Sequence, residues 1–202
     1  MTNTTLYPRT CTPNMHQRLV VRSLTTTDGT LTAMDDGLVV WSPHQGRPRR
    51  VAMHAHPTVL LVLRGPMGDV ATAVVGCADG SITVLSLPRM EQVGRFDIGG
   101  GAVRSICLLE PGSLAFLAGN QRGEVWALIN DAKPRATRLF TIDGPVSSLK
   151  VTEHDIHVRS GWMHHVRTLE GGAVSDHNTA AGYHERRYQR LGNVRPTQLL
   201  LT

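Results

Sequence analysis

Cysteine is scarce in this chain of 202 residues, with only Cys11, Cys77 and Cys107 at wide spacing. Their odd number and the absence of a Cys-x-x-Cys pair exclude a disulfide framework and a zinc knuckle. Reduced thiols suit a cytosolic or nuclear protein. Residues 1–5 lack the apolar segment of a secretory signal, and the longest apolar runs, such as Val59 to Leu63, are too short to span a bilayer. We therefore expect an intracellular protein without a membrane segment.

Aromatic residues make up only 4% of the chain, and lysine is limited to Lys133 and Lys150. The core must therefore be aliphatic, and nearly all the positive charge comes from arginine. The formal net charge of +5 favours anionic partners, but the arginines are spread along the chain and form no basic stripe. The 20 glycines and 11 prolines are typical of many short strands joined by tight turns.

Catalytic motifs are missing as well. No Gly-x-Ser-x-Gly sequence occurs, and the glycine-rich stretches at Gly99–Gly101 and Gly171–Gly172 lack the Lys-Ser/Thr ending of a phosphate loop. The side chains of the adjacent Asp35 and Asp36 diverge in a strand, so they cannot act as a carboxylate pair. We therefore expect no enzyme activity and no cofactor.

Histidine is frequent, with 10 residues in the chain. His54 and His56 lie two residues apart, which puts both on one face of a strand. Four more cluster further along, at His154, His157, His164 and His165. A zinc site needs three or four converging ligands, and no carboxylate pattern completes a recognised set, so we expect no metal site.

A turn followed by an apolar strand repeats along the chain. Three copies begin at Asp35, Asp79 and Arg122, which are 44 and 43 residues apart, and a weaker fourth begins at Ser160, 38 residues later. A period of about 40–45 residues with four strands per unit is the spacing of propeller blades. The sequence therefore predicts an all-β fold of about four β-propeller blades, each of four antiparallel strands.

The same spacing predicts the boundaries of the parts of the chain. We expect an N-terminal extension over residues 1–15, the blades over residues 16–172, and a basic C-terminal extension over residues 173–202 that includes a short helix at residues 180–191. No convincing fourth strand follows the third strand of the last unit. Leu199–Leu201 could supply this strand or pair with the first blade and close a ring.

These units resemble the WD40 repeat family. The segments Asp35–Ser42 and Asp79–Ser86 follow the family's Asp-Gly-x-Val-x-Val-Trp-Asp pattern, and Ala102–Leu109 is similar to its first strand. The family's aspartate after the tryptophan is missing in every unit, and only Trp41 keeps the tryptophan in frame, so the chain is a divergent member. The resemblance implies a structural hydrogen-bond network in the first blade, with the candidates His16, Thr32, Asp35 and Trp41, and an inter-blade position for His56.

The resemblance also implies a protein-interaction scaffold that does no chemistry. Its contact surface would be one propeller rim, at His54–Pro57, Gly99–Gly101, Asp143–Pro145 and the hairpin turns. The candidate partner-binding residues are His54, His56, Asp35, Asp36, Asp79 and Arg122.

The alternative is an RNA-associated propeller. The tail from Tyr183 to Arg190 places two tyrosines among three arginines, a composition that can stack on bases and hold phosphates. In this hypothesis Arg186, Arg187, Arg190 and Arg195 bind RNA. A docking peptide or a solvated extension explains the same tail.

Four blades are fewer than the roughly seven of a usual closed ring in this family. Because each blade buries its faces only against its neighbours, an open row leaves two faces in water. We expect exposed apolar edges that a second copy, a partner or further blades would cover.

Overall fold

The computed structural model describes residues 19–64, 70–110 and 113–179. In chain order its strands are β1 (Val20–Thr25), β2 (Gly29–Met34), β3 (Leu38–Pro43), β4 (Arg49–Ala52), β5 (Pro57–Arg64), β6 (Val70–Cys77), β7 (Ser81–Ser86), β8 (Glu91–Asp97), β9 (Val103–Leu108), β10 (Ala115–Asn120), β11 (Glu124–Ile129), β12 (Arg135–Thr141), β13 (Ser148–Val151), β14 (Asp155–Ser160), β15 (Met163–Thr168) and β16 (Ala173–Asn178). The described part of the chain contains no helix of the length and apolarity that a membrane span requires.

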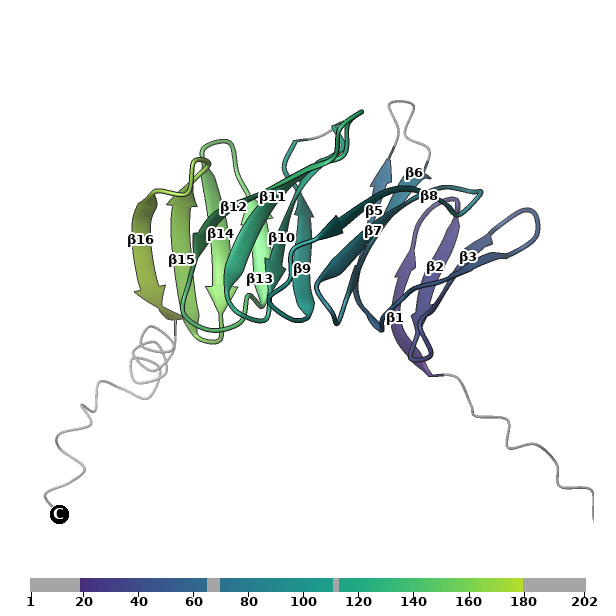
Figure 1. Ribbon diagram of the computed structural model, residues 1–202, viewed down its shortest axis with the longest axis horizontal. Helices are drawn as coiled ribbons and strands as arrows, with labels where there is room; N and C mark the ends of the chain where they lie inside the picture. Colours follow the sequence, from purple (N-terminus) through teal and green to yellow (C-terminus); the bar gives the residue numbers. More distant parts are fainter. Residues whose placement is uncertain (1–18, 65–69, 111–112, 180–202) are drawn as a thin grey trace, which may run out of the picture.

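The strands form four antiparallel sheets of four consecutive strands, β1–β4, β5–β8, β9–β12 and β13–β16, which we call blades 1 to 4. The first strands of consecutive blades contact each other, β1 with β5, β5 with β9 and β9 with β13. The blades stand in a row, with blade 1 and blade 4 at opposite ends (Figure 1). The all-β architecture of about four blades is therefore confirmed.

Three apolar layers hold the row together, one between each pair of neighbouring blades. The fully buried Trp41 belongs to the layer between blades 1 and 2. Between blades 2 and 3, the rings of Phe96 and Phe116 meet edge to face with centroids 5.7 Å apart. Between blades 3 and 4, Leu117 packs with Ile156. Removing this surface from water on both faces of the inner sheets stabilises the row.

One rim of the row, the lower one in Figure 1, carries the turn between the second and third strands of each blade and the connections between blades. The same backbone hydrogen bond recurs at this rim in blades 1 to 3. The amide of the residue directly after the fourth strand donates to the carbonyl of the turn glycine: Met53 to Gly37, Ile98 to Gly80 and Ile142 to Gly123. These three glycines have φ of 85°, 90° and 83°, a conformation that glycine adopts without steric cost. The upper rim carries the other hairpin turns.

The structure of blade 4 shows that the predicted end of the blades at residue 172 is wrong. Its fourth strand is β16 at Ala173–Asn178, a segment that we assigned to the C-terminal extension. The sequence of this strand is mostly polar because it is the outer strand of its sheet, with five of its six residues exposed, so it has none of the apolar pattern that marks a buried strand. Residues 180–191 and Leu199–Leu201, to which we assigned a helix and a closing strand, lie outside the described residues.

The prediction of exposed apolar edges at both ends of the row is confirmed at one end only. At blade 1, Leu19, Val20 and Val21 are 62%, 60% and 41% exposed, which agrees with the expected apolar edge. At blade 4 the expected apolar edge is not found on the face turned away from blade 3. This face is mostly polar and carries Lys150 and Arg159, with Val166 as an apolar residue beside them.

The network implied by the family resemblance is also not formed among the described residues. The indole Nε1 of Trp41 is buried without a hydrogen-bond partner, and the Asp35 carboxylate accepts the amide of Leu19 at 3.1 Å. His16 lies outside the described residues.

Candidate functional site

The predicted partner-binding residues gather at the lower rim and make hydrogen bonds within the protein. The ring of His56 donates to the carbonyl of Asp35, which links the connection between blades 1 and 2 to the turn of blade 1. Asp36 accepts the amide of Leu38 at 3.1 Å. These contacts give His56 and the two aspartates structural roles, and the exposed His54 lies beside them in sequence.

The corresponding turns of blades 2 and 3 are built in the same way. Asp79 Oδ1 accepts the amide and the hydroxyl of Ser81 at 2.9 and 2.6 Å. The amide of Arg122 donates to Asn120 Oδ1 at 3.0 Å. The structure thus brings these residues to one rim, and their role in binding stays a prediction. Arg186, Arg187, Arg190 and Arg195, the residues of the RNA hypothesis, lie outside the described residues.

The histidines of blade 4 divide between the two faces of its sheet. His157 Nδ1 and His164 Nε2 are hydrogen-bonded at 3.2 Å. His165 lies on the opposite face, where its Nδ1 donates to Asp176 Oδ1 at 2.8 Å. Within residues 19–64, 70–110 and 113–179, no group of three or more histidine, cysteine or acidic side chains is placed to hold a metal ion.

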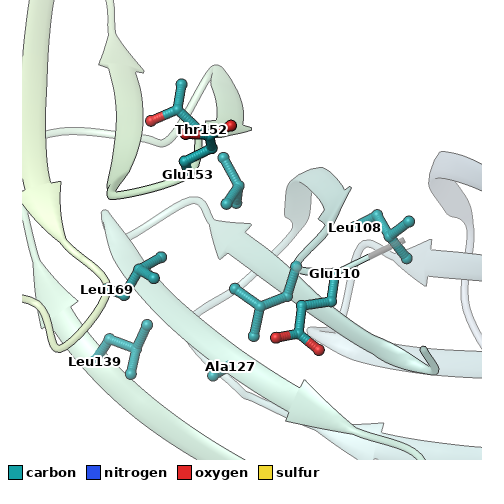
Figure 2. Close-up of a pocket in the computed structure, with 9 residues that line it drawn as sticks. Leu108, Glu110, Ala127, Leu139, Thr152, Glu153 and Leu169 are labelled. Carbon is teal, nitrogen blue, oxygen red and sulfur yellow. The ribbon is translucent and has the colours of Figure 1, made fainter. Parts of the chain in front are cut away.

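A groove of about 620 Å³ opens at the upper rim between blades 3 and 4. This volume falls in the range of about 300–1,000 Å³ that is typical of ligand pockets. The lining residues are Leu108, Leu109, Glu110, Ala127, Leu139, Val151, Thr152, Glu153 and Leu169. Figure 2 shows Thr152 and Glu153 at the top of the view and Leu108 and Glu110 at its right. Leu139 and Leu169 lie at the left, and Ala127 lies at the bottom.

The groove is apolar inside and acidic at its edges. Only Glu110, Thr152 and Glu153 have polar side chains among the lining residues, and all three are exposed. Leu139 and Leu169 remain partly open to solvent, with Leu169 38% exposed. Such a surface can bury an aliphatic side chain and attract a positive charge beside it.

Sequence reasoning missed this groove because its residues come from β9, β11, β12, β13 and the turns between strands of blades 3 and 4. The Asp-Gly-type turns, on which the sequence prediction of a contact surface was based, lie at the lower rim instead. One signal was available in the apolar Leu108–Leu109 directly before the Glu110 turn, and in Leu169, an apolar residue in a polar turn.

Comparisons with known proteins agree with the fold. No protein-family model matches the sequence, and no curated protein matches it. A crystal structure of the computationally designed Ika8 protein superposes with a TM-score of 0.64 at 15% identity, over 77% of this chain and 48% of that one. A chain in a crystal structure of the mitotic checkpoint complex superposes with a TM-score of 0.66 at 14% identity, over 80% of this chain and 52% of that one. The protein spans about half the length of these two chains, and at such identities the likeness shows the fold alone.

Proposed function

We propose that the protein is a non-catalytic protein-interaction scaffold of the WD40-repeat type, and that the groove between blades 3 and 4 binds an extended segment of a partner protein. The observation that carries this proposal is an apolar groove flanked by Glu110 and Glu153. A segment with an aliphatic side chain next to a lysine or arginine is complementary to it. The row of four-stranded blades, a fold shared with a chain of the mitotic checkpoint complex, provides the rigid frame that holds this groove.

The identity of the partner is not needed to test this proposal. A displayed library of random peptides is selected on the immobilised full-length chain, and the enriched peptides are measured for affinity in solution. We expect peptides that contain an aliphatic residue beside lysine or arginine. A charged residue in the groove should repel them, so Leu169→Lys should weaken binding by about tenfold or more, since a lost apolar contact and a like charge each oppose binding.

Leu114→Lys is the matched control. Leu114 is 41% exposed, close to the 38% of Leu169, and it lies outside the groove on blade 3. Both variants should fold, because both sites are exposed. Peptides that bind the Leu169→Lys and Leu114→Lys proteins equally well would show that the groove is not the binding site.

A further inference from the structure

The outward face of blade 4, turned away from blade 3, differs from the same face of every other blade. Strand register identifies which residues of the four blades occupy equivalent positions. Equivalent residues on the second strand of each blade pair with equivalent residues on the third strand. On the second strand, Leu31, Val74 and Leu117 correspond to His157, and Ala33, Gly76 and Gly119 correspond to Arg159. In blades 1 to 3 these positions are apolar or small and are covered by the next blade.

The other three strands show the same substitution. On the first strand, Leu24, Leu61 and Cys107 correspond to Lys150. On the third strand, Val39, Ile82 and Val125 correspond to His164. On the fourth strand, Val51, Phe96 and Phe140 correspond to His177. Five positions that are apolar or small in blades 1 to 3 therefore carry two permanent positive charges and three histidines in blade 4. A sixth position stays apolar, because Val166 pairs with His157 on this face.

Four of these five side chains, all except His177, line a hollow of about 410 Å³. Its lining residues are Ser148, Lys150, Thr152, His157, Arg159 and His164. The rings of His157 and His164 are nearly parallel with centroids 5.3 Å apart, and the ring of His177 lies 6.5 Å from that of His164. Thr152 lines both this hollow and the groove between blades 3 and 4, so the two sites are neighbours on different faces of the same sheet.

The outward face of blade 4 is unfavourable for packing against a further blade. At the interface of blades 3 and 4, Val146 fits against Gly119 so closely that a Cβ added to the glycine would lie 2.4 Å from Val146 Cγ1. Arg159 takes the place of that glycine in blade 4. A dry layer over Arg159 and Lys150 would strip water from two charges without supplying a counter-charge.

We propose that this hollow binds the phosphate group of a phosphorylated ligand. A phosphate dianion carries several acceptor oxygens and matches the donors that line the hollow. The Arg159 guanidinium can donate two parallel hydrogen bonds, the Lys150 ammonium supplies a compact charge, and the hydroxyls of Ser148 and Thr152 supply neutral donors. This proposal does not rest on the proposed peptide groove, with which the hollow shares only Thr152.

His164 makes anion binding at this face dependent on pH. The charged and titratable groups that share its face are Lys150 on β13, Asp155, His157 and Arg159 on β14 and His177 on β16, and His165 lies behind it on the opposite face. Burial, followed by the neighbouring His157, Arg159, His177 and His165, lowers the pKa of His164. A bound dianion offsets this positive charge and favours the protonated ring, so the affinity for the anion rises as the pH falls.

The test uses inorganic phosphate and the full-length chain, with calorimetry at constant ionic strength. We expect the wild-type protein to bind phosphate, and Arg159→Ala and Lys150→Ala each to weaken binding about tenfold, as the loss of a charge-assisted hydrogen bond predicts. Arg50→Ala is the matched control, because Arg50 is an exposed arginine on the sheet at the other end of the row. No phosphate binding by the wild type, or an equal loss in Arg50→Ala, overturns the proposal. Thermal unfolding without phosphate verifies that each variant is folded.

A second measurement isolates the histidines. Sulfate keeps its charge of −2 between pH 8 and pH 5.5, roughly the range in which histidine titrates, so any change in sulfate affinity reports on the protein. Affinity should rise as the pH falls for the wild type, and it should rise clearly less for the double variant His157→Gln and His164→Gln, which keeps His177 on the same face. An equal pH dependence in both proteins contradicts the role of the pair. Comparison of O-phosphoserine with adenosine 5′-monophosphate then distinguishes a phosphorylated protein segment from a nucleotide as the natural source.

Discussion

Replacement of Asp176 by asparagine is expected to destabilise blade 4. The carboxylate of Asp176 bonds Arg167 Nη1 at 2.7 Å and His165 Nδ1 at 2.8 Å. Arg167 and His165 are only 9% and 6% exposed. Removal of one partner from a fully buried ion pair costs about 3–5 kcal/mol. Because the Asp176 side chain is 47% exposed and water screens it, we expect about 1–2 kcal/mol.

Urea unfolding followed by circular dichroism measures this loss. With a slope of about 2 kcal/mol per molar urea, the midpoint should fall by about 0.5–1 M with the slope unchanged. Asp131→Asn is the control, since Asp131 bonds Arg135 at 2.9 Å at the surface, and it should leave the midpoint unchanged. Equal midpoints for the two variants would refute the argument that burial of Arg167 and His165 decides the cost.

The pH dependence of this effect has a defined sign. The hydrogen bond from Arg167, followed by that from His165, lowers the pKa of Asp176 to about 2, whereas an aspartate in an unfolded chain has a pKa of about 3.9. The stabilisation is therefore complete above about pH 4 and is lost as the pH falls from about 4 to about 2. The gap between the wild type and Asp176→Asn should close over that range.

Two further substitutions and one labelling experiment test the packing. Gly119→Ala should lower the free energy of unfolding by about 1–3 kcal/mol in a thermal melt, because the new methyl group overpacks the contact with Val146. Phe116→Ala should cost about 3–5 kcal/mol in urea unfolding, since its ring is fully buried. Burial raises the pKa of the Cys77 thiol and raises that of Cys107 to about 11, so iodoacetamide at pH 8 should label both only after unfolding, as mass spectrometry can show.

The fold was predictable because its unit repeats. The Gly37, Gly80 and Gly123 turns recur at a spacing that only a blade array explains, and each is followed by a buried strand. The end of the repeat was harder to predict, because β16 lies outermost in its sheet and needs no apolar residues. Strand periodicity identifies buried elements and is weak where one strand borders solvent.

The candidate sites were less predictable than the fold. The groove depends on which turns share the upper rim of blades 3 and 4, and this arrangement follows from the packing of the blades rather than from any short motif. The polar character of the outward face of blade 4 could have been predicted from the sequence. When the units are aligned by their hairpin turns, His157 is equivalent to Leu117 and Arg159 is equivalent to Gly119. This change from apolar or small residues to polar and cationic ones indicates a face that is not covered by another blade.

Hydrogen exchange of the full-length chain with and without a selected peptide tests the central claim most directly. We expect the peptide to slow exchange at the groove between blades 3 and 4, in the amides around Glu110, Leu139 and Glu153, and to leave the lower-rim amides unchanged. Protection confined to His54–Pro57 and the turn at Asp79, with none at the groove, would contradict the account and favour the lower rim as the surface that binds partners.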